Sequence, residues 1–202
     1  LPSYLEMKVR LSCYSKSSEE VEIRLSKAED MIVSSLGEWI YGKDNDTLEG
    51  KVGELFLENN KTLAVAESCT GGLIGHRLTQ TPGSSNYFLE GVVAYSNEAK
   101  SSRLEVSPSL IRKYGAVSEE VALAMADGVR KTSGADIGLS VTGVAGPDAS
   151  NNKPVGTVFI AISDEEKSDC KYFCFYSDRS RNKERSAQAG LDLLRRWFRN
   201  RI

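Results

Sequence analysis

The sequence of this 202-residue chain contains few of the residues that build metal centres. It has one histidine, His76, and its four cysteines (Cys13, Cys69, Cys170 and Cys174) form no Cys-x-x-Cys pair. Structural zinc sites need such pairs or several histidines, so we expect no metal ion, and we expect no cofactor. The last two cysteines lie in phase along a strand-like run, which is typical of buried free thiols and favours a reducing, cytoplasmic setting.

The sequence also lacks a large excess of charge of one sign, and it lacks long apolar runs. The net charge is −2, so electrostatics favours neither nucleic acid nor an anionic membrane as a partner. No apolar run approaches the roughly 20 residues of a membrane span. The chain begins with neither the basic and apolar regions of a signal peptide nor an initiator methionine, so we expect it to be part of a longer protein.

We expect residues 1–45 to form a small α/β module and residues 46–202 to form the main domain. Alternating apolar residues predict a half-buried strand over residues 5–13. Helical spacing then predicts a helix with Ser18 as its N-cap, and a short strand over residues 39–41. A strand–helix–strand unit of this size is too small to be a secure domain alone.

In the main domain, apolar runs typical of strands alternate with amphipathic stretches typical of helices. The predicted strands cover residues 62–66, 88–95, 137–141, 155–162 and 171–176, the last two adjacent and antiparallel. The predicted helices begin near residues 48, 71, 97, 108, 118 and 180. This alternation predicts an α/β fold with a mixed sheet covered by helices on both faces.

Residues 66–72 carry the strongest chemical signal. A buried strand ends here, hydroxyl residues follow, and a glycine pair precedes a helix. Ser68 and Thr70 would lie at the carboxyl end of a strand, where ligand sites of α/β proteins form. Gly71 and Gly72 let a ligand approach the backbone and leave helix N–H groups free for a phosphate or an oxyanion. An ordinary helix start with Thr70 as the N-cap explains the same residues.

Two further strand ends carry similar signals. Lys100 lies in the first turn of a predicted helix, where the helix dipole and burial would lower its pKa. A neutral lysine can accept the proton of a serine hydroxyl, although a surface lysine is the commoner case. The glycine-rich turn with Thr142, Gly143 and Gly146 suits N–H contacts with an anion or a carbonyl, or is an ordinary tight loop. Because these strand ends belong to one sheet, we expect them to converge.

Four other features have weaker functional interpretations. Residues 83–85 could contact phosphate or form a plain turn, and residues 178–183 could pair with phosphate or lie at a helix start. His76 is the one candidate for a serine–histidine relay, but no motif places it near Ser68. Residues 50–53 match the Gly-x-x-Gly of an RNA-binding loop, but they lie inside a helical pattern and are not assigned to RNA.

Six stretches resemble, in order and at family spacing, the C-terminal domain of the CinA family of competence/damage-inducible proteins. They cover residues 66–72, 82–85, 95–100, 115–118, 142–147 and 153–158. That domain is similar to a stand-alone nicotinamide-nucleotide amidase, and the resemblance extends from Thr47 to about Arg196. Residues 5–41 resemble part of the CinA connecting module, which in the family follows a further N-terminal domain that this sequence lacks.

The resemblance implies a reaction, a mechanism and a fold. Nicotinamide mononucleotide and water would give nicotinate mononucleotide and ammonia, with Ser68 as the nucleophile and Lys100 as the general base. N–H groups around Thr70, Gly71 and Gly72 would form the oxyanion hole. The nucleotide pocket would be lined by Ser84, Ser85, Tyr95, Thr142, Gly143 and Gly146, with Arg179 near the phosphate. The implied fold is a three-layer α/β/α sandwich like an anticodon-binding domain, assembled as a homo-oligomer of two or more chains.

This sequence departs from the family pattern around Arg179. The family usually has Pro-Gly or Ser-Gly before Asp-Arg and an arginine four residues later, whereas Tyr176, Ser177 and Lys183 stand at these positions here. A lysine contacts phosphate as a point charge and not as a bidentate fork. A catalytically silent nucleotide-binding or oligomerisation domain of a longer CinA-like protein is therefore the alternative to the amidase.

Overall fold

The computed structural model describes residues 5–150 and 153–199. Its contacts divide the chain into two compact units, Leu1–Thr47 and Leu48–Ile202. No helix in the described part of the chain is long and apolar enough to cross a membrane.

The N-terminal unit is built around one long helix. α1 (Ser18–Leu36) begins where the Ser17 hydroxyl accepts a hydrogen bond from the Glu20 N–H, one residue before the predicted cap, and η1 (Gly37–Trp39) follows it. The two predicted strands are wrong: residues 5–13 form no continuous strand, with a single β-bridge at Met7, and the second predicted strand begins within a 3-10 turn. Apolar alternation alone does not make a strand, because a strand also needs a neighbouring strand along its length to take up its N–H and C=O groups.

The main unit contains the predicted mixed sheet. Within the described residues its five strands are β1 (Leu63–Glu67), β2 (Phe88–Val93), β3 (Ile137–Gly143), β4 (Thr157–Ser163) and β5 (Ser168–Cys174). They lie in the order β2-β1-β3-β4-β5. β1 pairs in parallel with β2 and β3, whereas β3–β4 and β4–β5 are antiparallel. All residues of β1 are buried, as its nearly all-apolar sequence predicts for a strand in the middle of a sheet.

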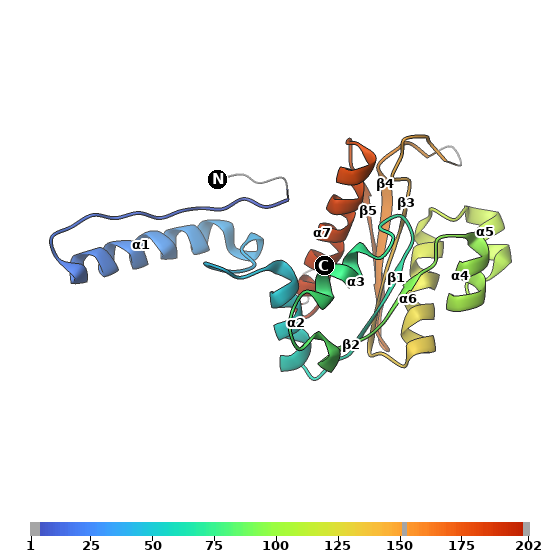
Figure 1. Cartoon of the computed structure of the whole chain (residues 1–202), viewed down its shortest axis with the longest axis horizontal. Coiled ribbons are helices and arrows are strands. Elements are labelled where there is room, and N and C mark those ends of the chain that lie inside the picture. Colours follow the sequence, from blue (N-terminus) through green and yellow to red (C-terminus); the bar gives the residue numbers. More distant parts are fainter. Residues whose placement is uncertain (1–4, 151–152, 200–202) are drawn as a thin grey trace. The chain divides into compact units, whose positions relative to one another are not determined.

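Helices cover both faces of this sheet, which confirms the predicted fold class (Figure 1). One face carries α2 (Leu48–Glu58), α3 (Leu73–Thr79) and α7 (Arg179–Trp197), and the other carries α4 (Asn97–Leu104), α5 (Pro108–Tyr114) and α6 (Glu119–Ser133). Ala64, Val121 and Met125 are among the fully buried core residues between α6 and the sheet. α6 lies this close to β3 because Gly138 has no side chain: a Cβ there would lie 2.1 Å from Ala126 O.

The parallel pairing places the carboxyl ends of β1, β2 and β3 at one edge of the sheet, here called the carboxyl edge. Ser68 follows β1, and its N–H donates to Val141 O in β3 at 2.9 Å. Ala94 follows β2, and its N–H donates to Glu67 O at 2.8 Å. The strand ends that the sequence marks as functional are therefore tied together by backbone hydrogen bonds.

Candidate active site

Ser68 and Lys100, which the sequence predicts as nucleophile and base, are in contact. Lys100 lies in α4, which begins where the Ser96 hydroxyl accepts a hydrogen bond from the Ala99 N–H at 3.0 Å. Lys100 Nζ lies 3.1 Å from Ser68 Oγ and 2.9 Å from Ala94 O. Ser68 is 8% exposed and Lys100 is 2% exposed, so little water reaches this contact.

Burial favours the neutral form of Lys100. Its ammonium has lost most of its water, and this desolvation lowers the pKa of Lys100 from its ordinary value of 10.5, whereas negative charge on Cys69 would raise it. A lowered pKa increases the fraction of neutral amine at any given pH. The neutral amine can accept the hydroxyl proton of Ser68 as the serine oxygen attacks a carbonyl.

Cys69, the neighbour of Ser68 in the chain, is not a competing nucleophile. Burial raises the pKa of the Cys69 thiol to about 12, and the charge of Glu67 acts in the same direction. At pH 7 only about one thiol in 10⁵ would then be ionised, and the thiolate is the reactive form.

We therefore expect Cys69→Ala to keep kcat within about threefold of wild type, because a buried, protonated thiol acts as a small apolar group. Iodoacetamide should label Cys69 more slowly than Cys13, which is only partly buried. Steady-state kinetics of the variant and mass spectrometry of the labelled wild-type peptides measure both effects. A large loss of kcat in Cys69→Ala would assign the thiol a part in the reaction.

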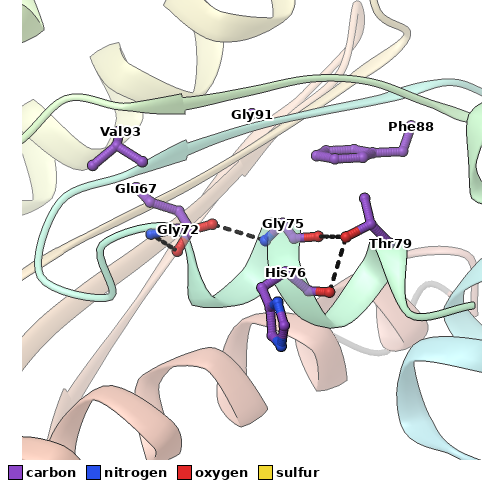
Figure 2. Close-up of a pocket in the computed structure, with 8 residues that line it drawn as sticks. All are labelled: Glu67, Gly72, Gly75, His76, Thr79, Phe88, Gly91 and Val93. Carbon is purple, nitrogen blue, oxygen red and sulfur yellow. Dashed lines mark hydrogen bonds between the residues drawn. The ribbon is translucent and has the colours of Figure 1, made fainter.

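The turn after Ser68 is held by the side chain of Glu67. Its carboxylate accepts hydrogen bonds from the N–H groups of Gly72 (3.0 Å), Ile74 (3.1 Å) and Gly75 (2.9 Å). These N–H groups belong to the start of α3, where the N-cap residue Gly72 makes no side-chain cap. Figure 2 shows the carboxylate between Gly72 and Gly75. Sequence reasoning misses this role, although a charged residue at the end of a buried strand is a visible signal.

The structure corrects two expectations for Thr70, Gly71 and Gly72. Thr70 is not the N-cap of α3, because that position is Gly72, and Thr70 Oγ1 is buried without a hydrogen-bond partner. The Gly71 N–H donates to Ser68 O at 3.1 Å and the Gly72 N–H donates to Glu67, so neither is free to hold an oxyanion in this conformation. Both glycines have positive φ, 63° and 94°, which makes this tight turn accessible.

Three predicted binding residues from different segments, Tyr95, Gly146 and Arg179, are in contact. The Arg179 guanidinium donates one hydrogen bond to Gly146 O and another to Tyr95 Oη, the latter at 2.7 Å. Tyr95 directly follows Ala94, whose carbonyl oxygen contacts Lys100. The Arg179 cluster therefore adjoins the base of the proposed dyad.

Lys183, which stands where the family usually has an arginine, reaches the turn after the nucleophile. α7 begins at Arg179 because the Asp178 side chain accepts the Arg181 N–H at 3.0 Å. Lys183 lies about one turn further along, and its Nζ is 3.6 Å from the position that a Cβ at Gly71 would take. The first turns of α7 therefore bring two cations to the carboxyl edge.

Thr142 and Gly143 lie at this edge, but both have structural contacts. Thr142 Oγ1 donates to Ala116 O at 2.8 Å, so this hydroxyl holds the segment before α6. Gly143 allows β3 and β4 to pair closely, since a Cβ there would lie 2.7 Å from Thr157 O. These contacts explain both residue types without a ligand.

Ser84 and Ser85 are not brought near Ser68 within one chain. They lie in η2 (Ser84–Asn86), which precedes β2, and the next residue, Tyr87, accepts the Leu63 N–H at the amino end of β1. One strand length, roughly 16 Å for five residues, separates that edge from Ser68. The parallel direction of β1 and β2 causes this separation.

A shallow hollow of about 240 Å³ lies between α3 and β2 (Figure 2). It is lined by Glu67, Gly72, Gly75, His76, Thr79, Phe88, Gly91 and Val93. Glu67 lines this hollow, whereas the Ser68 hydroxyl contacts Lys100 in α4, which covers the other face of the sheet. The hollow and the Ser68 hydroxyl are therefore on opposite sides of the sheet.

His76 is no partner for Ser68. It lies in α3, is exposed, and in Figure 2 its side chain projects away from Phe88 and Val93. Because the Ser68 hydroxyl faces α4, a serine–histidine relay has no geometric basis. In residues 5–150 and 153–199, no group of three His, Cys, Asp or Glu residues could hold a metal ion.

Residues 45–198 match the family model of the CinA C-terminal domain. The chain belongs to the CinA family. A CinA-like protein of Desulfotalea psychrophila is 52% identical over 168 residues, covering 83% of this chain and 41% of that protein. A CinA-like protein of Syntrophus aciditrophicus is 44% identical over 199 residues, covering 98% of this chain and 47% of that protein. The chain thus spans about half the length of the curated relatives it matches.

Solved structures of CinA proteins share this fold. The competence damage-inducible protein A (ComA) of Klebsiella pneumoniae has a TM-score of 0.72 and 31% identity, covering 73% of this chain and 92% of that chain. The competence/damage inducible protein CihA of Agrobacterium tumefaciens has a TM-score of 0.71 and 33% identity, covering 77% of this chain and 96% of that chain. The family and the fold predicted from the six sequence stretches are confirmed, whereas none of these names states a reaction.

Proposed function

We propose that this chain is an amidase that hydrolyses nicotinamide mononucleotide to nicotinate mononucleotide and ammonia. The observation that carries the proposal is the buried contact of 3.1 Å between Ser68 Oγ and Lys100 Nζ. A serine hydroxyl beside an amine of lowered pKa is an activated nucleophile with its own base. The resemblance to the nicotinamide-nucleotide amidase supplies the substrate.

In the first half of the reaction, the Ser68 oxygen attacks the carboxamide carbon while neutral Lys100 takes the hydroxyl proton. The Lys100 ammonium then gives that proton to the amide nitrogen, the C–N bond breaks, and ammonia leaves a nicotinoyl ester on Ser68. In the second half, Lys100 takes a proton from water as the water oxygen attacks the ester. The proton returns to the Ser68 oxygen, so one water is consumed and one ammonia is released.

Two cations of α7 are suited to the phosphate of this substrate. Arg179 and Lys183 lie about one turn apart in the first turns of the helix, where the dipole also favours an anion. Arg179 contacts Tyr95, and Lys183 lies against Gly71. We infer that the nucleotide binds with its carboxamide at Ser68 and its phosphate toward α7.

We expect Lys183→Ala to raise KM for nicotinamide mononucleotide roughly 10- to 100-fold, because a hydrogen bond to a charged group contributes about 1.5–3 kcal/mol. KM for nicotinamide riboside, which has no phosphate, should change little. Lys131→Ala is the control, since this exposed lysine lies at the far end of α6 and pairs with Asp127. An equal rise of KM for both substrates would place Lys183 away from the phosphate.

A catalytically silent nucleotide-binding domain is the second candidate, and one observation favours it. Arg179 already uses two hydrogen bonds within the protein, to Gly146 and Tyr95, which leaves fewer donors for a phosphate. Ammonia release by the purified chain, incubated with nicotinamide mononucleotide, decides between the two. Many turnovers per chain support the amidase, whereas calorimetric binding without ammonia supports the silent domain.

A further inference from the structure

The Glu67 carboxylate is buried without a cation beside it. Glu67 is 2% exposed, and no lysine or arginine in the described part of the chain forms a salt bridge with it. Burying a charge is costly unless hydrogen bonds compensate for the lost water. The N–H groups of Gly72, Ile74 and Gly75 supply that compensation. An ionised carboxylate has about four acceptor positions and no donor, so it can serve all three donors at once.

These hydrogen bonds close the turn that carries the nucleophile. Residues 68–72 form a loop that starts at the Glu67 backbone. The loop closes where the Gly72 N–H donates a hydrogen bond to Glu67 Oε2 at 3.0 Å. Inside this loop the Gly71 N–H also donates to Ser68 O at 3.1 Å. Both ends of the turn are thus attached to one residue, and freeing the Glu67 side chain would free the turn next to Ser68.

The backbone of Glu67 supports the other member of the dyad. Its carbonyl oxygen accepts the Ala94 N–H at 2.8 Å, and the Ala94 carbonyl oxygen accepts a hydrogen bond from Lys100 Nζ at 2.9 Å. Glu67 therefore holds the Ser68 turn with its side chain, and with its main chain it holds the strand end against which Lys100 lies.

We propose that Glu67 is a positioning residue, whose carboxylate holds the Ser68 turn in register with Lys100. The proposal rests on the serine–lysine dyad of the proposed function, but it concerns the reactivity of Ser68 and not the identity of the substrate. Glu67 faces the hollow on the opposite side of the sheet from the Ser68 hydroxyl and touches neither reacting atom.

A fluorophosphonate probe, which reacts covalently with activated serines, separates this proposal from the choice of substrate. The second-order rate of Ser68 labelling is measured by intact-protein mass spectrometry for the wild-type chain, Glu67→Gln and Glu67→Asp. Glu67→Gln should label at least tenfold more slowly, because its amide places an N–H donor against backbone donors. Glu67→Asp keeps the carboxylate and should recover part of the rate. The apparent pKa of the rate-against-pH profile should stay near the wild-type value although Glu67→Gln removes a charge, because the Glu67 carboxylate contacts neither Ser68 Oγ nor Lys100 Nζ.

Asp136→Asn provides a matched control at the opposite end of β1, because Asp136 precedes β3 and its carboxylate binds Thr62. The Asp136 carboxylate accepts hydrogen bonds from the Thr62 N–H (2.8 Å) and Thr62 hydroxyl (2.7 Å) at the amino end of β1. This variant should lower the melting temperature as Glu67→Gln does, but leave the labelling rate within about twofold of wild type. Equal slowing in Asp136→Asn and Glu67→Gln would show general destabilisation and overturn the proposal.

Two further results would overturn it. A labelling rate for Glu67→Gln within twofold of wild type would show that the carboxylate does not align Ser68, and a shifted pH profile would show that it acts through charge.

Should Glu67→Gln fail to fold, amide exchange of the wild-type chain still tests the hydrogen bonds. The N–H groups of Gly72, Ile74 and Gly75 should exchange slowly, although N–H groups in a first helical turn are usually unprotected, and fast exchange would refute the proposal. Labelling without ammonia release would reject the amidase alone and support the dyad that Glu67 positions.

Discussion

Replacing Ser68 with alanine should lower kcat for nicotinamide mononucleotide by roughly 10⁴- to 10⁶-fold, the loss expected when a covalent nucleophile is removed. The fold should remain intact. The Ser68 N–H keeps its bond to Val141 O, and the lost hydroxyl contacts only Lys100 among the described side chains. Losing one such hydrogen bond costs about 1 kcal/mol, so thermal unfolding and circular dichroism should resemble wild type.

Ser102→Ala is the control for Ser68→Ala, because Ser102 lies in α4 on the same helix as Lys100 but is exposed. It should leave kcat and KM unchanged. Ammonia release, followed under saturating substrate for all three proteins, measures the effect. A Ser68→Ala enzyme that retains a tenth of the wild-type activity would move the nucleophile to Thr70 or to water.

The second large effect concerns Lys100 and the pH dependence of kcat/KM. Desolvation lowers the pKa of Lys100, and the base must be neutral to accept the Ser68 proton. kcat/KM should therefore rise as pH increases through an apparent pKa below the ordinary lysine value of 10.5 and level off above it. The rate rises with pH because the active form is the deprotonated amine, whose fraction increases as protons are removed.

Three variants of Lys100 separate its proton from its charge. Lys100→Ala and Lys100→Arg should both lower kcat by roughly 10²- to 10⁴-fold, since alanine has no base and a guanidinium keeps its proton. Lys100→Met should be equally inactive yet well folded, because it keeps the apolar stem and removes a charge that is costly to bury. Kinetics and thermal unfolding of all three give the comparison.

An active Lys100→Arg enzyme would contradict the general-base role and show that only positive charge is needed at this position. A flat pH profile in the wild-type chain would do the same. In either case the Ser68 proton would need another acceptor. Since His76 is exposed in α3 while the Ser68 hydroxyl faces α4, that acceptor would have to be water.

The resemblance to the CinA family paired Ser68 with Lys100 in the sequence, and the two segments are also local signals. A short apolar strand that runs into Ser68, and a lysine in the first turn of a capped helix, are each visible in a window of about ten residues. The carboxyl ends of parallel strands meet at one edge, so a predicted α/β sheet already brings the two segments near one another. For the same reason the Arg179 contact with Tyr95 and Gly146 joins segments that had been predicted separately.

The departures from the sequence-based expectations have a common physical cause: each depends on a contact that the residue pattern alone does not specify. Apolar alternation over residues 5–13 says nothing about whether a neighbouring strand exists, and these residues form no continuous strand. Ser84 and Ser85 occupy a loop at the amino end of β2, and only the strand direction shows that this loop is remote from Ser68. The N–H groups of Gly71 and Gly72 are occupied because Ser68 O and Glu67 take them.

Family membership, the alternation of strands and helices, and the residue types at the strand ends were all decided by sequence, because periodicity and motif spacing are properties of short stretches. The contact between two side chains 32 positions apart, the lowered pKa of Lys100 and the capping of α3 by Glu67 were decided only by tertiary structure. Each of these depends on burial or on a distance set by strand register and helix packing. Lys100 shows the difference most clearly: taken alone, its sequence position is that of an ordinary surface lysine, and only the packed sheet removes water that stabilises its charge and so lowers its pKa.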